Sequence, residues 1–125
     1  MKYVFDETKF VVLDCEVYRN FVMIALKNIN KEEIIRIEIR GSESSISEKN
    51  RVLLKKILSS RHTFGFNSIN YDIPIICAML QNYKVSDIFK VSDYIVNTRI
   101  DGRKVKSWQT MNHFDFNFPD RFVHF

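Results

Sequence analysis

An apolar run that ends in two acids constrains this chain more than any other stretch. Residues 10–16 read Phe-Val-Val-Leu-Asp-Cys-Glu, and the consecutive apolar residues, two of them β-branched, predict a strand buried on both faces. Side chains alternate along a strand, so Asp14 and Glu16 share one face with Cα atoms about 6.6 Å apart, while Cys15 points the other way. We therefore expect two carboxylates over one spot at the end of this strand.

Two carboxylates held this close repel each other, and the pKa of one rises unless a cation lies between them. Mg²⁺ or Mn²⁺ would remove that conflict, because these hard ions take carboxylate oxygens at about 2.0–2.1 Å and leave positions for water and phosphate. The alternative is that both acids are solvated and only mark the strand end. Asp-x-Glu alone does not decide between the two interpretations.

The composition is that of a single folded domain spanning residues 1–125. Apolar residues make up 46% and charged residues 27%, which is ordinary for a soluble globular protein. The net charge of +4 weakly favours a polyanionic partner, because basic residues that neutralise phosphates release counterions. Cys15 and Cys77 lack the spacing of a zinc site or a disulfide framework and predict reduced core residues. No apolar run approaches membrane-spanning length, so we expect a cytoplasmic protein without membrane contact.

The pattern along the chain predicts an α/β fold, with helices packed on a mixed sheet. A tight connection at 18–20 leads to an apolar strand at 21–26, and the alternating Ile residues of 33–40 predict a half-exposed third strand. These three strands are expected to form an antiparallel meander. The later predicted elements are a helix opening at 47–50, a strand at 61–66, helices at 71–83 and 85–96, a hairpin at 100–106 and a strand at 121–125.

The helix that opens at 47–50 is predicted to be amphipathic. Its apolar residues recur at helical spacing and its basic residues lie opposite, which favours a solvated basic surface over a nucleic-acid site. We expect the core to contain Ile46, Val52, Leu53, Ile57 and Leu58, and the solvated face to contain Arg51, Lys55 and Lys56.

A further acid, Asp72, follows the predicted strand at 61–66 and lies at the mouth of the next helix. If that strand lies beside the first one, Asp72 can reach the space between Asp14 and Glu16. Three acids from two elements are the minimum for a pair of metal ions about 3.5–4 Å apart. The alternative is that Asp72 is a helix N-cap, whose carboxylate accepts hydrogen bonds from the first free amides.

These two stretches together resemble a known family. Residues 13–16, Leu-Asp-Cys-Glu, are similar to the first motif of the DEDD (DnaQ-like) 3′–5′ exonuclease superfamily. Residues 65–74, Gly-Phe-Asn-Ser-Ile-Asn-Tyr-Asp-Ile-Pro, are similar to the second motif, in the version found in phage exonucleases and family B DNA polymerase proofreading domains. The resemblance covers residues 10 to about 82 and implies a ribonuclease H-like fold with the order β-β-β-α-β-α-α-β.

The resemblance implies metal-dependent hydrolysis of phosphodiester bonds from the single-stranded 3′ end of DNA or RNA. Asp14 would bridge two Mg²⁺ or Mn²⁺ ions, and Glu16 and Asp72 would complete their ligand shells. One ion would activate a water molecule, and the other would stabilise the leaving 3′ oxygen. The terminal nucleotide would pass the second motif, where an aromatic ring can stack a splayed base. The substrate-binding residues implied are Asn67, Tyr71 and Phe66.

The third motif of this family, Tyr-x-x-x-Asp or His-x-x-x-x-Asp on a helix after the last core strand, is absent from its expected place. Tyr83 and Asp87 have the spacing, but they follow Asp72 so closely that no core strand fits between, and we interpret them as coincidence. Asp115 or Asp120 could replace the missing ligand. We therefore expect a domain that lacks the family's C-terminal helix.

The chain ends on an apolar, strand-like segment, and exposed strand edges invite pairing with other chains. This ending predicts either a fragment of a longer exonuclease or an edge covered by a partner chain or a second copy. Three functions stay open. The first is an exonuclease, active or impaired by truncation, and the second is a catalytically deficient nucleic-acid-binding or protein-interaction module with the same fold. The third is an unrelated α/β adaptor whose acids are surface residues.

Overall fold

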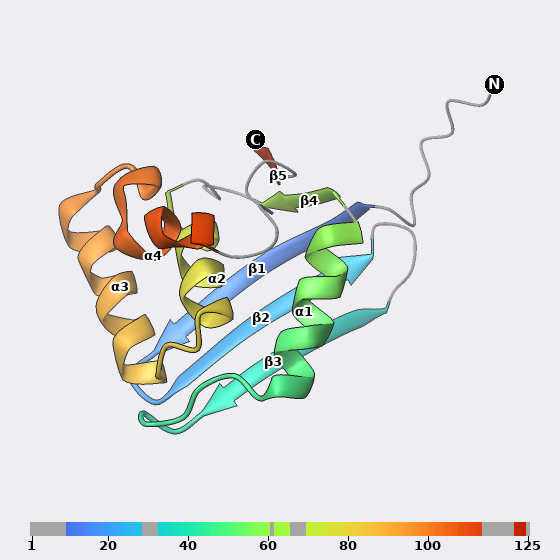
Figure 1. Cartoon of the computed structure of the whole chain (residues 1–125), viewed down its shortest axis with the longest axis horizontal. Helices are drawn as coiled ribbons and strands as arrows, with labels where there is room; N and C mark the ends of the chain where they lie inside the picture. Colours follow the sequence, from blue (N-terminus) through green and yellow to red (C-terminus); the bar gives the residue numbers. More distant parts are fainter. Residues whose placement is uncertain (1–9, 29–32, 61, 66–69, 114–121, 125) are drawn as a thin grey trace.

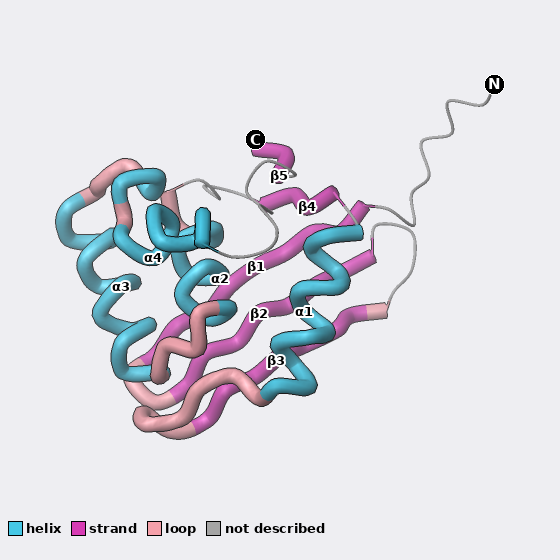
Figure 2. The backbone as a smooth tube through the Cα atoms, viewed as in Figure 1, coloured by secondary structure: helices cyan, strands magenta, loops and turns pink. Residues whose placement is uncertain are grey.

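The computed structural model describes residues 10–28, 33–60, 62–65, 70–113 and 122–124. Within these ranges the elements follow the predicted order β-β-β-α-β-α-α-β, with short helical turns added before the last strand (Figure 2). The strands are β1 (Phe10–Tyr18), β2 (Phe21–Asn28), β3 (Ile34–Arg40), β4 (His62–Gly65) and β5 (Phe122–His124). The helices are α1 (Glu48–Ser60), α2 (Asp72–Leu80), α3 (Val85–Thr98) and α4 (Lys106–Gln109), with the 3-10 turns η2 (Gly102–Lys104) and η3 (Thr110–His113).

The five strands form one mixed sheet in the order β3-β2-β1-β4-β5. The first three make the predicted antiparallel meander, in which Tyr18 pairs with Phe21 across a two-residue turn. The fourth strand lies parallel to β1, and β5 lies parallel to β4 at the edge of the sheet (Figure 1). The α/β class and the mixed sheet with packed helices are thus confirmed.

The helices of the described part of the chain pack on one face of this sheet (Figure 1). Val11, Leu13 and Cys15 point into that core, whereas Val12 is 40% exposed on the opposite face. The prediction that β1 is buried on both faces is therefore wrong, since its apolar run alternates between a covered face and an open one. The predicted separation of the two acids from Cys15 is confirmed by the same alternation.

The α2 helix lies at the centre of the helical layer, and every one of its residues is buried. After Asp72 its sequence is apolar all round, which is typical of a helix enclosed on every side. The helix ends at Leu80, earlier than the predicted residue 83, because Asn82 adopts the left-handed conformation with φ of 63°. Asn is one of the few residues that adopt this conformation readily, so it ends a helix well.

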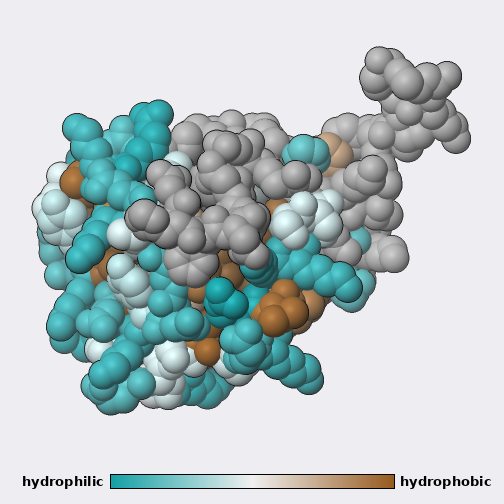
Figure 3. Space-filling view, in the orientation of Figure 1, coloured by the Kyte–Doolittle hydropathy of each residue, from teal (hydrophilic) through white to brown (hydrophobic). Residues whose placement is uncertain are grey.

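The amphipathic character of α1 is confirmed, but its faces differ from the predicted ones. Val52 and Leu53 are 54% and 37% exposed, and they contribute to the apolar surface over α1 (Figure 3). Arg51 does not point into solvent, because its Nε donates a 3.0 Å hydrogen bond to the carbonyl of Leu80 at the end of α2. The buried face of α1 consists of Leu54, Ile57 and Leu58.

The predicted hairpin at 100–106 does not form. The Asp101 carboxylate instead accepts a 3.0 Å hydrogen bond from the backbone N–H of Arg103, and this contact starts η2. Asp side chains compete in this way with strand pairing, because they offer the backbone a local acceptor. Among the helices of the described residues, none has both the length and the apolar character that crossing a membrane requires.

Candidate active site

The sheet has a reversal point between β1 and β4. These strands are parallel neighbours, but the chain continues from β1 to β2 on one side and from β4 toward β5 on the other. In open sheets with parallel strands, ligands bind outside the carboxyl ends of the strands at such a reversal. Asp14 and Glu16 lie in the carboxyl-terminal half of β1, and Asp72 begins the helix after β4. The fold therefore brings the strand that carries Asp14 and Glu16, and the start of the helix that carries Asp72, to the place where this rule expects a site.

Asp14 and Glu16 are both exposed on the open face of the sheet. Their partners in β2 are Ala25 and Met23, which carry no charge. Within the described ranges no basic side chain forms a salt bridge with either acid. The two carboxylates consequently share one face, as predicted, and the strand register places Lys27 and Arg36 on that same face near Asp14.

Asp72 is only 4% exposed, and its side chain is directed at β1. Burial, and then the negative charge of Asp14, raise the pKa of Asp72 to about 7, whereas hydrogen bonds from the backbone N–H and thiol of Cys15 lower it. The alternative in which Asp72 is the N-cap is wrong, because Tyr71 occupies that position and Asp72 is the first helical residue. The carboxylate thus contacts the strand that carries the other two acids.

Asp72 lies beside a part of β1 that β4 does not pair with. Pairing of β4 with β1 extends only from Phe10 to Val12. Beyond Val12, the edge of β1 that faces away from β2 has no strand beside it in the described residues. A backbone N–H in a buried strand needs an acceptor, and Asp72 supplies one at Cys15. In turn, burial, and then the charges of Asp72 and Asp14, raise the pKa of the Cys15 thiol.

Within the described parts of the chain, no group of three or more His, Cys, Asp or Glu side chains could hold a metal ion as it stands. Asp14 and Glu16 project from the open face, whereas Asp72 is turned toward Cys15. The three donors are nevertheless all carboxylates, the ligand type that Mg²⁺ and Mn²⁺ prefer. The charge of Asp14 that raises the pKa of Asp72 is also the kind of repulsion that a divalent cation relieves.

Tyr71 is the one predicted substrate-binding residue that lies in a described range. It is half-buried, and its hydroxyl lies 2.7 Å from the Ser92 hydroxyl of α3. Burial raises the pKa of Tyr71. The other two predicted substrate-binding residues, Phe66 and Asn67, fall outside the described residues, as do Asp115 and Asp120.

Tyr83 and Asp87 do not form a helical motif. Tyr83 lies in the loop before α3, and Asp87 belongs to the first turn of that helix. The family's third motif places both residues on one helix, so the spacing in this chain is the predicted coincidence. This pair therefore does not supply a fourth carboxylate to the site.

The roles of Cys15 and Ser92 at this site are not predicted by the sequence. Cys15 is predicted only to fill the core, and it does so, but it also lies beside Asp72 and lowers the pKa of that carboxyl group. Its position between the two acids was the available signal, since strand alternation directs this residue to the face opposite theirs. Ser92 carried no signal, because its contact with Tyr71 depends on how α3 packs.

Comparison with known proteins identifies no relative, because no family, no curated protein and no solved structure matches this chain. The resemblance to DEDD exonucleases accordingly rests on the two motifs and stays a prediction.

Proposed function

We propose that this chain is a metal-dependent 3′–5′ exonuclease domain with a ribonuclease H-like fold, acting on single-stranded ends of DNA or RNA. The observation that carries the proposal is the position of Asp72, which is buried against the acid-bearing strand and lies in the electric field of Asp14. The parallel pairing of β4 with β1, on which this position depends, supports it as well.

The environment of Asp72 argues against a purely structural role. A neutral Asn could accept the hydrogen bond from the N–H of Cys15 without the cost of placing a second negative charge near Asp14. Retaining a buried acid whose pKa is raised to about 7 lowers stability at neutral pH. Buried acids with such a perturbed pKa are more frequent at functional sites than elsewhere.

In this proposal Asp14, Glu16 and Asp72 would hold Mg²⁺ or Mn²⁺. When bound, these ions would supply a hydroxide nucleophile and stabilise the leaving 3′ oxygen. Cys15 keeps the Asp72 carboxylate beside β1, and Ser92 fixes the ring of Tyr71 next to it. The open face of the sheet leaves Asp14 and Glu16 accessible to substrate.

A second candidate is a catalytically deficient module that binds nucleic acid or protein through the same fold. It is favoured by the lack, in the described ranges, of a ready-formed group of three ligands. The absence of the third motif from the sequence points the same way. The two candidates differ in whether phosphodiester bonds are broken.

Digestion of a 5′-labelled single-stranded oligonucleotide, as DNA and as RNA, separates these candidates. With Mn²⁺ we expect products that shorten stepwise from the 3′ end, and with EDTA we expect none. Asp14→Asn should lower the rate about 100-fold or more, because even residues that only orient a metal ligand contribute 10- to 100-fold. Asp93→Asn, which changes an exposed acid on α3, is the matched control and should leave the rate unchanged.

Two results would contradict the exonuclease proposal. Intact oligonucleotide at high protein concentration, with binding retained, would favour the deficient module. Equal cleavage by the wild type and Asp14→Asn would show that the observed activity does not come from this site.

A further inference from the structure

The open face of the sheet carries cations as well as acids. Directly paired residues of neighbouring strands point to the same face. Asp14 pairs with Ala25 on β2, and Ala25 pairs with Arg36 on β3, so these three residues form one row across the sheet. Lys27, two residues beyond Ala25, lies diagonal to Asp14 in the same register. The exposed Asp14 therefore has two exposed basic side chains on its own face.

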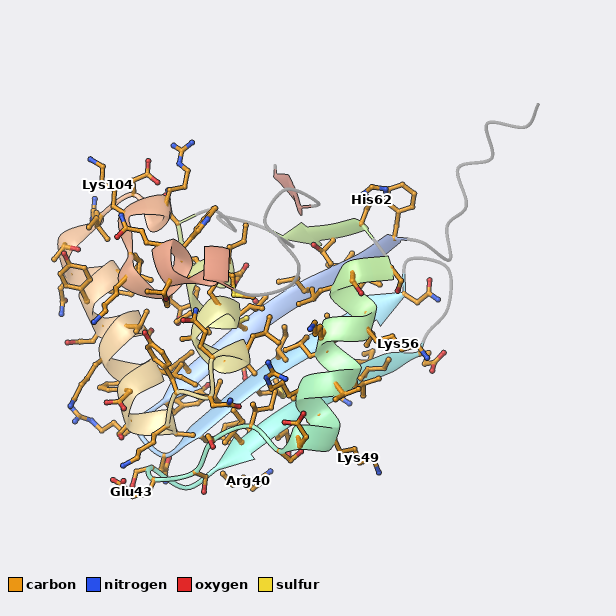
Figure 4. The ribbon with its side chains drawn as sticks, viewed as in Figure 1. Arg40, Glu43, Lys49, Lys56, His62 and Lys104 are labelled. Carbon is orange, nitrogen blue, oxygen red and sulfur yellow. The ribbon has the colours of Figure 1, made fainter. Side chains whose placement is uncertain are left out.

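Within the described chain, no acid holds Arg36 or Lys27 in a salt bridge. The other charges that β3 carries on this face belong to Glu38 and Arg40, which form a 3.0 Å salt bridge with each other. Arg40 also lies 4.8 Å from the ring centre of Phe21, at the end of β3 (Figure 4). Two cations thus lie beside the candidate active site without being committed to a described carboxylate.

The row leaves room for the Arg36 side chain to reach a ligand over the acids. Neighbouring strands lie about 4.8 Å apart, so the Cα atoms of Asp14 and Arg36 are separated by about 9.6 Å. The residue between them is Ala25, whereas the next row has Met23 in the same position. Arg is one of the longest side chains, and no large side chain of β2 stands between its guanidinium and the carboxylate of Asp14 in this row.

This arrangement of charge suits a phosphate. The acids of β1 are the ligand type that a divalent cation prefers, and such a cation is commonly shared with substrate phosphates. A guanidinium binds two phosphate oxygens at once, with a planar fork of donors that an ammonium lacks. Lys27 adds a second positive charge on the same face. A cation that is already in place where negative charge develops would stabilise the transition state of hydrolysis.

We infer that Arg36 is a further catalytic residue, which reaches over Ala25 and contacts an oxygen of the scissile phosphate, while Lys27 adds to the positive field. The identity of the phosphate rests on the proposed exonuclease function, but its binding is measurable without cleavage. Hydrolysis that releases the 3′ oxygen leaves a nucleoside 5′-monophosphate, so the phosphate of this product would occupy the same place.

The first test uses the opposite effects that Arg36 should have on a metal ion and on a phosphate. Its charge repels a divalent cation held by Asp14 and attracts the phosphate. In Arg36→Gln, an exposed position, we expect Mn²⁺ alone to bind about two- to threefold more tightly at low salt. Thymidine 5′-monophosphate in saturating Mn²⁺ should bind about tenfold more weakly. Titration calorimetry measures both constants, and a variant that only disturbed the fold would weaken both.

Two further variants separate charge from geometry. Arg36→Lys keeps the charge and loses the fork of donors, so its affinity for Mn²⁺ should match the wild type and its affinity for the monophosphate should be only partly restored. Lys56→Gln removes one positive charge from α1, in the helical layer (Figure 4). This matched control should change neither constant.

Ala25→Met tests the path of the Arg36 side chain. It places in this row the side chain that Met23 provides in the next one, and it changes no charge. We expect weaker binding of the monophosphate and an unchanged affinity for Mn²⁺. Unchanged binding of the monophosphate in this variant would overturn the inference that Arg36 acts across Ala25.

Single-turnover cleavage of the labelled oligonucleotide in saturating Mn²⁺ tests the catalytic role. We expect Arg36→Gln to lower the rate constant about 100-fold, as the loss of one preorganised donor does. Arg36→Lys should recover part of this loss, and Lys56→Gln should cleave at the wild-type rate.

The failure of this inference differs from the failure of the proposed function. Cleavage by the wild type, together with equal cleavage by Arg36→Gln, would refute the role of Arg36 and leave the exonuclease proposal standing. Binding of the monophosphate that depends on Arg36, without any cleavage, would support the phosphate contact and refute the exonuclease proposal. Equal affinity of the wild type and Arg36→Gln for the monophosphate, or no binding by the wild type, would overturn the inference.

Discussion

Asp72 is subject to two opposing requirements. Its burial and the nearby charge of Asp14 favour the neutral acid, whereas a metal ligand must be ionised. The hydrogen bonds from Cys15 favour the ionised form, but they do not outweigh the other effects, since the pKa is raised to about 7. At neutral pH this residue is therefore present in both forms. Protonation of Asp72 should consequently raise the stability of the fold and weaken metal binding.

The first prediction concerns stability at different pH values. Because the pKa of Asp72 is raised from 3.8 in its ordinary state to about 7 in the fold, its contribution to stability is fully present below about pH 4. That contribution is lost as the pH rises through about 7. The Asp72→Asn variant has no carboxyl group that can ionise, so it keeps this stability at high pH. We expect it to be more stable than the wild type at about pH 8 by on the order of 2–4 kcal/mol. Denaturant unfolding at several pH values measures the difference.

The same variant should be inactive, and its advantage in stability should shrink toward about pH 5, where Asp72 of the wild type is protonated. Asp93→Asn, on the exposed face of α3, should change the free energy of unfolding little at either pH. A destabilised Asp72→Asn protein at about pH 8 would show that the carboxylate stabilises the fold.

At the scale of elements, one side chain joins the two helices over the middle of the sheet. Arg51 on α1 donates to the carbonyl of Leu80, one of the last carbonyls of α2, which have no partner within their own helix. Its side chain is only 20% exposed. This contact stabilises the end of the helix that begins with Asp72, so it also helps to place the site.

The second prediction is that Arg51→Met lowers the free energy of unfolding by about 1.5–3 kcal/mol. This is the usual contribution of a hydrogen bond from a charged donor, and Met retains much of the aliphatic packing. Urea unfolding measures the change. Lys56→Met, on the exposed part of the same helix, should cost less than about 0.5 kcal/mol. Equal effects of the two changes would contradict the assigned role of Arg51.

The elements that the sequence predicted well are those set by local pattern. The alternation of Ile in β3 and the short turn at 18–20 determine the meander, and both are found as expected. The predicted burial of β1 on two faces failed, because consecutive apolar residues cannot show on which faces helices will pack. The hairpin at 100–106 failed because the Asp101 side chain started a helical turn instead.

The candidate site, like the fold, was predictable where local sequence pattern determines it. The shared face of Asp14 and Glu16 follows from strand alternation, and the proximity of Asp72 follows once β4 pairs with β1. The hydrogen bonds of Asp72 with Cys15 were not predicted. They depend on how helices distant in the sequence pack against the sheet, and no local pattern encodes that packing.

At the scale of the whole molecule, the fold divides the site between two environments. Asp72 belongs to the buried helical layer, whereas Asp14 and Glu16 lie on the face of the sheet that the described helices leave open (Figure 1). A cation bound by all three acids would link the helical layer to the open face of the sheet. Metal binding should therefore raise the free energy of unfolding of the whole domain.

The third prediction is that Mn²⁺ raises the midpoint of thermal unfolding at about pH 8. A ligand at one hundred times its dissociation constant stabilises the native state by about 2.7 kcal/mol, which for a domain of this size corresponds to an increase on the order of 10 °C. The increase should be smaller at about pH 6, because a proton then competes with the cation for Asp72. Scanning calorimetry measures both values.

Two variants make this result specific to the proposed ligands. Asp14→Asn should abolish the increase, whereas Asp93→Asn should retain it, because both lose one negative charge but only the first loses a ligand. If Mn²⁺ stabilised the two variants equally, its effect would come from general screening of acidic charge, and the three acids would not form a common metal site. The proposed site predicts instead that the stabilisation by Mn²⁺ is lost in Asp14→Asn and is smaller at low pH. Both results together would indicate that one cation contacts Asp14 on the open face and the buried Asp72.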